Sequence, residues 1–307
     1  MKLDKNPMLI APLSGIDDPE GAKIPESMPF VVDAHVHVFP ESIFQSIWNW
    51  FDQYGYPIRY RLNTEEVFNF LLSHGVGHIV ALQYAHKPGI AKDLNRYMAG
   101  HCKKYAGKVT GMATVFPGEE GVEDTLDEAF RLGLKGVKLH THVQCFDMNS
   151  AELDIIYQTC SDNEKPLVLH AGREPKSPAY KCDPYQLCSA EKLERVIRNY
   201  PRLKLCVPHL GMDEFSAYQQ LIERYENLWL DTTMALTDFF PGNAPPSLDD
   251  FRADRVMYGT DFPNLPFSWD REIRCIDEAG LSEYSLNLIM GKNAIEFYSI
   301  EMDDMVT

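Results

Sequence analysis

From residue 30 onward, short apolar runs rich in β-branched residues alternate with longer segments that have apolar side chains at helical spacing. Continuous apolar runs of this kind are typical of strands that are buried on both faces of a parallel sheet. The pattern predicts strands at 30–37, 78–84, 108–115, 135–141, 166–170, 203–209, 228–233 and 255–261. It predicts helices between them at 63–74, 91–104, 121–132, 151–163, 189–199 and 215–226.

Two of these helices have recognisable starts. Asn63 is followed by Glu65 and Glu66, and Ser189 is followed by Glu191. Each helix therefore begins with a capping side chain and acidic residues in its first turn.

Strands that alternate with helices imply a parallel sheet, and eight is the number of strands that closes a barrel. We therefore expect an α/β fold, a single (β/α)8 TIM barrel over residues 30–307. Residues 1–29 are rich in proline, glycine and acids and are expected to form an N-terminal extension. A doubly wound open sheet is the competing architecture, but no glycine-rich phosphate loop follows the first predicted strand.

The connection after the first strand is unusually long, at residues 38–62. It is rich in aromatic side chains, namely Phe39, Phe44, Trp48, Trp50, Phe51, Tyr54, Tyr56 and Tyr60. In a barrel this segment lies on the C-terminal face, over the active site. Two interpretations stay open: the rings pack on the rim or at a subunit interface, or they form a lid that contacts substrate.

The histidines are placed unevenly along the chain. Of the 10 histidines, those at or just beyond the end of a predicted strand are His35, His37, His86, His140, His142, His170 and His209. Catalytic groups of a barrel converge at this end of the strands. A single histidine there is usually a satisfied rim residue, but this accumulation indicates a functional site.

The first strand carries the sharpest signal. Successive side chains of a strand alternate between faces, so Asp33, His35 and His37 are expected to share one face, opposite Ala34 and Val36. Two inward imidazoles at this spacing can reach one metal ion.

Three further strands end on groups that bind metals, at His170, His209 and Asp261. A buried carboxylate is costly unless it meets a metal or a cation, so Asp261 is a candidate ligand. A buried salt bridge or a helix cap is the alternative for this residue. Imidazoles together with a carboxylate suit zinc, and also manganese, iron or nickel.

Composition narrows the choice of partners. The net charge is −16, from 45 acids against 29 bases, which disfavours nucleic acid. No apolar stretch is long enough to span a membrane, and the apolar run near the N-terminus is too short for a secretory signal. The 7 cysteines form no paired framework, so reduced thiols and a cytoplasmic location are expected.

The motifs, in their order along the chain, resemble the amidohydrolase superfamily. They are His35-Val36-His37, Gly136-Val137-Lys138-Leu139-His140, His170, His209-Leu210-Gly211, Gly259-Thr260-Asp261-Phe262-Pro263 and Gly291-Lys292-Asn293-Ala294. The last motif is similar to the closing helix of the amidohydrolase-2 branch. This branch of metal-dependent hydrolases includes aminocarboxymuconate-semialdehyde decarboxylase, and the resemblance covers roughly residues 30–300.

The resemblance implies a role for each residue. His35, His37, His170 and Asp261 would bind one divalent metal, Zn²⁺ or another ion such as Mn²⁺, and leave a position for water. Zinc lowers the pKa of bound water from about 15.7 to about 7. Asp261 would also act as general base, and His209 would polarise the substrate as an acid or base.

Lys138 leaves the number of metals open. It shares strand parity with His140, so both are expected to point inward. In binuclear members of the superfamily a lysine on the fourth strand is carboxylated and bridges two metals, which His170 and His209 would here help to bind. The aminocarboxymuconate decarboxylase pattern lacks this lysine, and a buried lysine paired with an acid is the alternative. One ion is expected.

Several cations follow the strands on the same face. They are Arg59, Arg61, His86, Lys87, His142 and Arg173, and such a cluster suits a small substrate that bears a carboxylate.

The favoured function is hydrolysis of a small organic acid derivative, an amide or lactone, by a metal-activated water. The alternative is non-oxidative decarboxylation of an unsaturated or aromatic acid, and a hydratase is a third candidate. A non-catalytic binding protein would need a broken ligand set, and none of the expected ligands is missing. A TatD-like nuclease is disfavoured by the negative charge and by Lys138. A homo-oligomer is compatible with the sequence.

Overall fold

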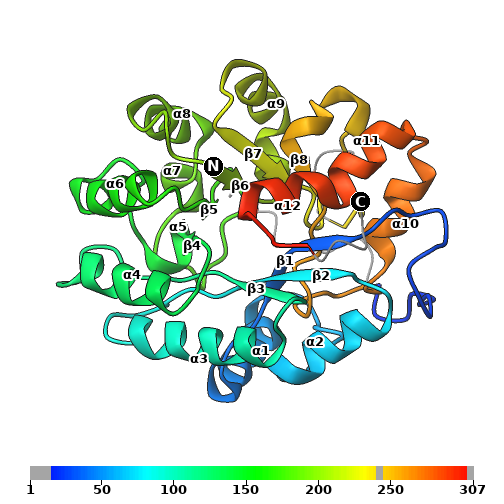
Figure 1. The fold of residues 1–307 in the computed structure, drawn as a ribbon, viewed down its shortest axis with the longest axis horizontal. Coiled ribbons are helices and arrows are strands. Elements are labelled where there is room, and N and C mark those ends of the chain that lie inside the picture. The colour runs from blue at the N-terminus through cyan, green and yellow to red at the C-terminus, as the bar shows by residue number, and fades with distance from the viewer. Residues whose placement is uncertain (1–14, 240–244, 303–307) are drawn as a thin grey trace, which may run out of the picture.

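Parallel strands occupy the centre of the computed structural model, which describes residues 15–239 and 245–302, and helices surround them (Figure 1). The strands are β1 (Val32–His37), β2 (His78–Leu82), β3 (Val109–Gly111), β4 (Val137–His140), β5 (Leu167–His170), β6 (Leu205–Val207), β7 (Leu228–Asp231) and β8 (Val256–Met257). Each lies within a predicted range, so the predicted strands are confirmed. All are buried, as expected for strands covered on both faces.

The strands form two parallel sheets, β1-β2-β3 and β4-β5-β6-β7-β8, which join into one barrel. At the first junction Ala113 is bridged to Val137. At the second, Val36 is bridged to Phe262, and the His37 amide donates to the Phe262 carbonyl at 2.8 Å. The first strand thus pairs with the chain that follows the last strand. The predicted TIM barrel is confirmed, and the open doubly wound sheet is excluded.

The six predicted helices are also present. They are α2 (Thr64–Ser73), α3 (Ala91–Lys104), α4 (Val122–Arg131), α6 (Asp154–Asp162, after a single turn at Ala151–Leu153), α8 (Ala190–Asn199) and α9 (Phe215–Arg224). The Asn63 side chain accepts from the Glu65 and Glu66 amides. The Glu66 carboxylate in turn accepts from the Asn63 amide. Ser189 caps α8 by accepting from the Lys192 amide. Both predicted helix starts are confirmed.

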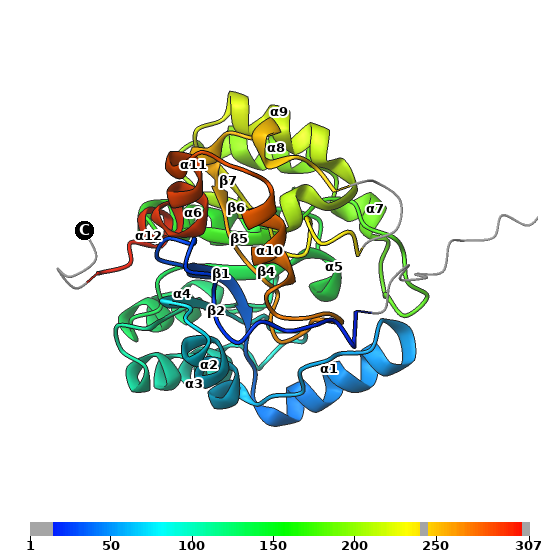
Figure 2. The same cartoon turned by 90° about the vertical axis from the view of Figure 1, so that its right-hand side faces the viewer.

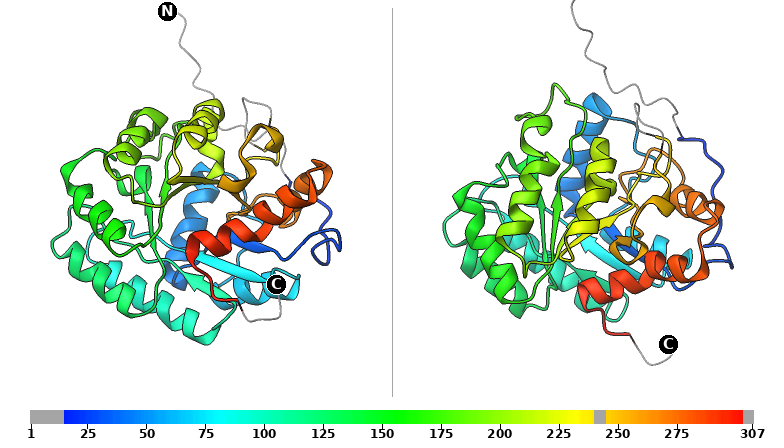
Figure 3. Two further views of the ribbon diagram at one scale, coloured as in Figure 1. Left: turned by 45° about the horizontal axis from the view of Figure 1, so that its top comes forward. Right: turned by 90° about the horizontal axis from the view of Figure 1, so that it is seen from above.

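Further helices lie outside the six ranges that the apolar pattern predicts, and the longest of them is α1 (Glu41–Tyr54) in the aromatic connection. Its buried face carries Phe44 and Trp48, which pack with Phe39 and Ile58. The remaining helices are α5 (Thr141–Gln144), α7 (Pro184–Leu187), α10 (Arg271–Glu278), α11 (Glu283–Asn287) and α12 (Asn293–Tyr298). Single 3-10 turns occupy Leu248–Asp250 and Ala253–Arg255, a kinked 3-10 segment spans His209–Glu214, and a π-helical turn spans Leu288–Lys292. Figure 3 shows the ring of helices from two further directions.

Apolar side chains fill one end of the barrel. Val32, Ala34, Val80, Met112, Val168, Cys206 and Met257 form a buried cluster with Ala294, Phe297 and Tyr298 of α12. Figure 2 shows α12 at one end of the barrel and α1 at the other. The end under α12 is therefore a packed core, which leaves the end under α1 for polar groups.

A bulge in β1 changes which way its side chains face. Between Asp33 and Val36 the register against β2 is irregular, with an extra residue in β1. Ala34 consequently belongs to the cluster with α12, whereas Val36 belongs to the core between barrel and outer helices. The strict alternation predicted for this strand, which put Asp33 on the face of His35 and His37, was wrong.

Residues 15–29, the described part of the predicted extension, contact the chain around the start of α10. Asp18 pairs with Arg271 at 3.1 Å, and the Gly21 carbonyl accepts from the Trp269 indole at 3.1 Å. The rest of the extension lies outside the described residues. Within the described ranges, no helix combines the length and apolar character needed to cross a membrane.

Asp33 holds the closing seam together. Its carboxylate accepts from the His35 amide at 3.1 Å, the Thr260 amide at 3.1 Å and the Thr260 hydroxyl at 2.6 Å. Burial raises the pKa of Asp33 to about 7, against the lowering effect of these hydrogen bonds. The bonds thus compensate a fully buried carboxyl group where β1 meets the chain after β8.

Removing the hydroxyl at the seam is expected to destabilise the barrel. Thr260→Val keeps the shape of the side chain but leaves a buried carboxylate oxygen without its donor, at a cost of about 1.5–3 kcal/mol. Denaturant unfolding measures the loss. Thr125→Val is the control, because its hydroxyl bonds only the Gly121 carbonyl within α4, and a loss of about 1 kcal/mol or less is expected there. Equal losses in the two variants would contradict the role of the seam.

Candidate metal centre and active-site cavity

Closure of the barrel brings His35, His37 and Asp261 together. Asp261 follows β8, and its amide donates to the His35 carbonyl at 2.9 Å, which places the carboxylate beside the end of β1. Asp261 Oδ1 lies 3.0 Å from His37 Nε2 and 3.4 Å from His35 Nε2. The two Nε2 atoms are 3.2 Å apart. We call these three residues the first donor group; one donor atom from each lies within 4.8 Å of the others.

The chemistry of the first donor group fits a divalent transition metal. Burial holds the pKa of His35 well below its usual range, so the imidazole is neutral and its lone pair is available. Burial acts to raise the pKa of Asp261, but the neighbouring imidazoles, His37 foremost, hold it below its usual range. Two imidazoles and a carboxylate are the donors that zinc and similar ions take in catalytic sites, with the next position left for water.

Asp231 orients His35 from behind. Its Oδ2 lies 2.8 Å from His35 Nδ1, and its Oδ1 accepts from the His209 amide at 3.2 Å. A carboxylate on one ring nitrogen places the proton there and directs the other nitrogen toward a ligand. His35 Nε2 is therefore the free donor atom of this ring.

His209 stands beside the first donor group. Its Nδ1 donates to the Thr233 carbonyl at 2.8 Å, so Nε2 is the nitrogen left for chemistry. The His209 ring centroid lies 5.8 Å from that of His35 and 5.0 Å from that of His170. His209 (φ 58°) and Asp261 (φ 73°) both have left-handed backbone, which non-glycine residues adopt at a cost and which clusters at functional sites.

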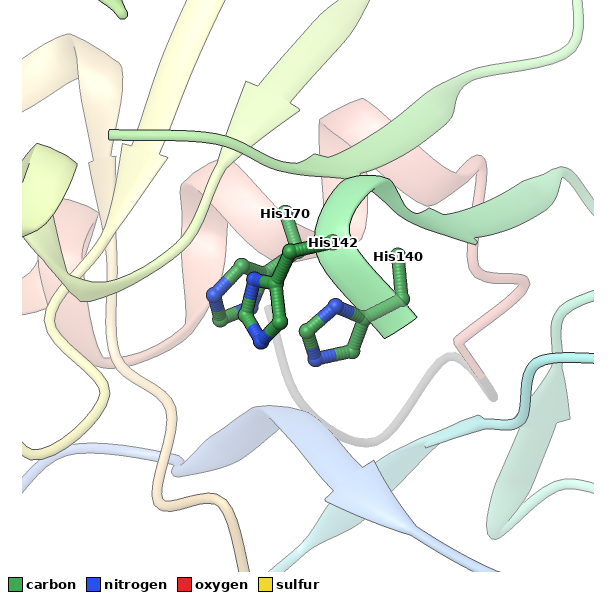
Figure 4. A group of neighbouring side chains, drawn as sticks. All are labelled: His140, His142 and His170. Carbon is green, nitrogen blue, oxygen red and sulfur yellow. The ribbon is translucent and has the colours of Figure 1, made fainter. Parts of the chain in front are cut away.

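His170 belongs to a second cluster of imidazoles. His140 ends β4, His142 lies in α5 and His170 ends β5, and the three rings gather in front of these strands (Figure 4). We call these residues the second donor group, and one ring nitrogen from each lies within 4.8 Å of the others. The His140 and His170 rings are stacked at 3.9 Å, and Glu174 Oε2 lies 3.2 Å from His170 Nε2. Of the four predicted ligands, three form the first donor group, and His170 lines the same cavity as His37 and Asp261, so a single ion bound by all four stays a prediction.

Lys138 points into the barrel near both groups. Its neighbours Val137 and Leu139 belong to the core under the helices, which agrees with the predicted inward direction of Lys138. Burial lowers the pKa of Lys138 to about 8, opposed by Asp231 and Asp261. Within residues 15–239 and 245–302 its Nζ has no hydrogen-bond or ion-pair partner, so the predicted alternative of a direct pair with an acid is not found. The carboxylated bridge stays a prediction.

Both donor groups face one cavity of about 130 Å³. Its polar lining comprises His37 and Asp261 of the first donor group, the second donor group, and His209. Its walls are aromatic, formed by Trp50, Phe51, Tyr56, Tyr84 and Tyr180. An outer cavity of about 360 Å³ shares Trp50, Tyr84 and Tyr180 and is lined by His86 and Lys181.

The aromatic side chains of α1 divide between the two interpretations of this connection, rim packing and contact with the substrate cavity. Trp48 and Phe44 are buried in a rim cluster, whereas Trp50 and Phe51 line the cavity. Trp50 stacks on Tyr180 with ring centroids 5.6 Å apart, so α1 meets the loop that follows β5 at the cavity wall.

Some of the residues predicted to contact substrate lie at the cavities, and others do not. Arg59 pairs with Glu20, Arg61 with Asp52 and Arg173 with Glu214, and none of the three lines either cavity. Lys87 is exposed. His86 lines the outer cavity, and His142 is in the second donor group. The three arginines pair with acids because long cationic side chains pair readily with the many surface carboxylates, and their contact with substrate stays a prediction.

Sequence reasoning missed Glu174, Asp231, Tyr84 and Tyr180. Asp231 had a usable signal, because it follows an apolar strand as Asp261 does. Glu174 and Tyr180 lie in the loop after β5, where no local pattern shows which side chains turn toward the cavity.

Comparison with known proteins places this geometry in context. The family model described as Amidohydrolase matches residues 32–300. The sequence matches none of the curated proteins.

Several solved structures share the fold. An uncharacterised TIM-barrel protein from Bordetella bronchiseptica has a TM-score of 0.69 at 18% identity, over 88% of this chain and 98% of that chain. A proposed 2-pyrone-4,6-dicarboxylic acid hydrolase from Pseudomonas putida has a TM-score of 0.63 at 18% identity, over 89% and 99%. A 5-carboxyvanillate decarboxylase from Novosphingobium aromaticivorans, complexed with manganese and 4-hydroxy-3-methoxy-5-nitrobenzoic acid, has a TM-score of 0.64 at 16% identity, over 92% and 100%.

At these identities the solved structures establish the TIM-barrel fold alone. The family model, in contrast, spans the barrel from the start of β1 to the end of α12. Since it matches most of the sequence, this chain belongs to the amidohydrolase family.

Proposed function

We propose that the chain is a metal-dependent hydrolase that cleaves a small organic acid derivative, an amide or lactone, with water. The observation that carries the proposal is the first donor group, in which the Asp261 carboxylate stands 3.0 Å from His37 Nε2 and both residues line the cavity. When bound there, a divalent ion such as zinc or manganese supplies Lewis acidity and lowers the pKa of bound water to about 7.

Asp261 and His209 then have separate roles in the proposed reaction. Asp261 Oδ1 faces the imidazoles, and Oδ2 accepts the proton of the attacking water as general base. As the water oxygen bonds to the acyl carbon, the ester or amide bond breaks, and the proton passes to the leaving oxygen or nitrogen. The Thr233 carbonyl accepts from His209 Nδ1–H, so His209 polarises the substrate carbonyl by donating from Nε2–H in its imidazolium form.

The cavity favours a small flat substrate. Its volume of about 130 Å³ fits a single ring, and Tyr56, Tyr84 and Tyr180 supply flat walls. No arginine or lysine is among its described lining residues, so a substrate carboxylate would meet the imidazoles, the metal or Lys181 of the outer cavity.

Decarboxylation of an aromatic acid is the second candidate, and the aromatic walls favour it. Similar folds carry the names of both activities, including the decarboxylase complexed with a nitrobenzoic acid and a 2,6-dihydroxybenzoate decarboxylase complexed with 2,6-dihydroxybenzoate. In this reaction His209 Nε2 would deliver a proton to the ring carbon as CO₂ leaves.

Product analysis tests which reaction occurs. The protein is incubated with 2-pyrone-4,6-dicarboxylate and with hydroxybenzoates in ¹⁸O-labelled water. We expect ¹⁸O in the organic product of the lactone and no CO₂. Release of CO₂ with a proton in its place would reject the hydrolase and support the decarboxylase.

Removal of metal is expected to abolish turnover without unfolding the chain. The barrel is held by its apolar core, so one ion is not needed for folding as it is in a zinc finger. Chelator-treated protein should keep its far-UV circular dichroism, lose activity, and regain it with zinc or manganese. Full turnover by protein shown to be free of metal would reject the mechanism.

Asp261→Asn is expected to lower kcat by about 10²–10⁴ while a metal is still bound, because the amide keeps an oxygen donor but cannot take the proton. His209→Asn should lower kcat similarly. Asp213→Asn is the control, since this carboxylate lies outside the cavity and accepts from the Tyr185 hydroxyl. Steady-state kinetics with metal analysis gives the answer, and unchanged kcat in Asp261→Asn would remove its role as base.

A further inference from the structure

We propose that Cys145 and Cys182 form a reversible disulfide, a redox modification site beside the outer cavity. The two thiols belong to neither donor group and take no part in the proposed reaction. The inference therefore goes beyond the proposed function and does not depend on it.

Two sulfur atoms from segments far apart in the sequence meet at this place. Cys145 Sγ lies 3.0 Å from Cys182 Sγ. A disulfide bond is about 2.0 Å long, so a shift of about 1 Å would bring the two atoms to bonding distance. The His142 carbonyl oxygen lies within hydrogen-bond distance of both, 3.3 Å from Cys145 Sγ and 3.1 Å from Cys182 Sγ. The two thiols are therefore gathered around one backbone oxygen.

Short helices fix the backbone next to each thiol. Cys145 ends α5, and its amide donates to the Thr141 carbonyl. Cys182 directly precedes Asp183, whose side chain caps α7 by accepting from the Tyr185 amide at 3.0 Å. The helices α5 and α7 are neighbours in the fold. Because both thiols adjoin helical turns, little backbone freedom has to be lost for the sulfur atoms to bond.

Exposure distinguishes this pair from the other cysteines. Cys145 is exposed and Cys182 is half-buried, whereas Cys160, Cys188 and Cys206 are buried. Within residues 15–239 and 245–302, no other two cysteine sulfur atoms lie within hydrogen-bond distance of each other. An accessible thiol beside a second one is the arrangement that redox-sensing cysteines often have.

The oxidant would be a low-molecular-weight disulfide such as oxidised glutathione. The Cys145 sulfur, after losing its proton to water, attacks one sulfur of this disulfide, whose S–S bond breaks and releases one glutathione thiolate. The Cys182 sulfur, likewise deprotonated, then attacks the Cys145 sulfur of the mixed disulfide and releases the second thiolate. The two cysteines together lose two electrons and two protons, and the glutathione disulfide takes up both to become two thiols. Excess reduced glutathione reverses the two steps.

The bond would join two segments that line the outer cavity. Tyr180 and Lys181, which directly precede Cys182, line this cavity, and so does Val143 of α5. Tyr180 also stacks on Trp50 of α1. A disulfide would tie the loop after β5 to α5. Oxidation would thereby restrict the motion of the cavity wall that carries Tyr180.

Thiol counting with peptide mapping tests the proposal without any substrate. The full chain is equilibrated in glutathione buffers that run from fully reduced to fully oxidised, quenched with acid, alkylated in denaturant and digested for mass spectrometry. The reduced chain should show all 7 thiols. We expect the oxidised wild type to lose two of them, to yield one cross-linked peptide pair that joins Cys145 to Cys182, and to recover both thiols in reduced glutathione.

Serine variants identify the pair. Cys145→Ser and Cys182→Ser should each form no disulfide within the chain. Cys275→Ser is the matched control, because Cys275 is also partly exposed but has no cysteine sulfur beside it among the described residues, and it should form the disulfide as the wild type does. Serine is nearly isosteric with cysteine, and circular dichroism checks that each variant folds.

Hydrogen exchange measures the effect on the cavity wall. Backbone amides of residues 174–183 should exchange several-fold more slowly in the oxidised wild type than in the reduced protein, because opening of this loop is restricted. The oxidant should leave their exchange unchanged in Cys145→Ser. A disulfide that formed without slowing this exchange would reject the restriction of the wall.

Three results would overturn the disulfide itself. The first is a wild type that keeps all its thiols in oxidised glutathione. The second is a cross-link that joins other cysteines. The third is a chain that carries glutathione on Cys145 and never forms the bond to Cys182.

Discussion

The rest of the molecule depends on how the barrel closes between β1 and the chain after β8. Backbone bonds from His37 to Phe262 and from Asp261 to His35 make this seam, and buried Asp33 stabilises it. Gly259 is required there, because a Cβ atom at this position would lie 2.8 Å from the His35 Cβ atom, inside contact distance. The seam has a chemical consequence, since a donor on the first strand and one beyond the last become neighbours only when the barrel is shut.

Polar groups concentrated at one end of the barrel form the candidate site, and their burial there costs free energy. At the end under α12 the interior is apolar and packed, whereas at the other end imidazoles and carboxylates are desolvated together. Groups such as Asp231 and the Thr233 carbonyl offset part of that cost by orienting His35 and His209. Neighbouring imidazoles hold the pKa values of Asp261 and Glu174 below their usual range, and a bound cation would neutralise these two carboxylates further.

The sequence by itself determined the barrel and the outline of the site. All the predicted strands and helices are present in the structure. Each depends on a local periodicity of apolar residues, which is visible in the sequence itself. Asn63 and Ser189 marked helix starts for the same reason, since a cap acts within one turn. His37 and Asp261 were identifiable because polar residues at the ends of buried strands need partners, and a parallel barrel gathers all such ends on one face.

Only the tertiary structure decided how those residues combine. The bulge in β1, which sets the direction of the His35 side chain, arises from pairing with β2 and leaves no signal in a single strand. His170 joined His140 and Glu174 because β4 and β5 are neighbours and the loop after β5 folds back over them. Arg59 turned to an acid in the N-terminal segment that is distant in sequence. Contacts of this kind depend on loop paths and long-range pairing, and these form only when the whole chain has packed.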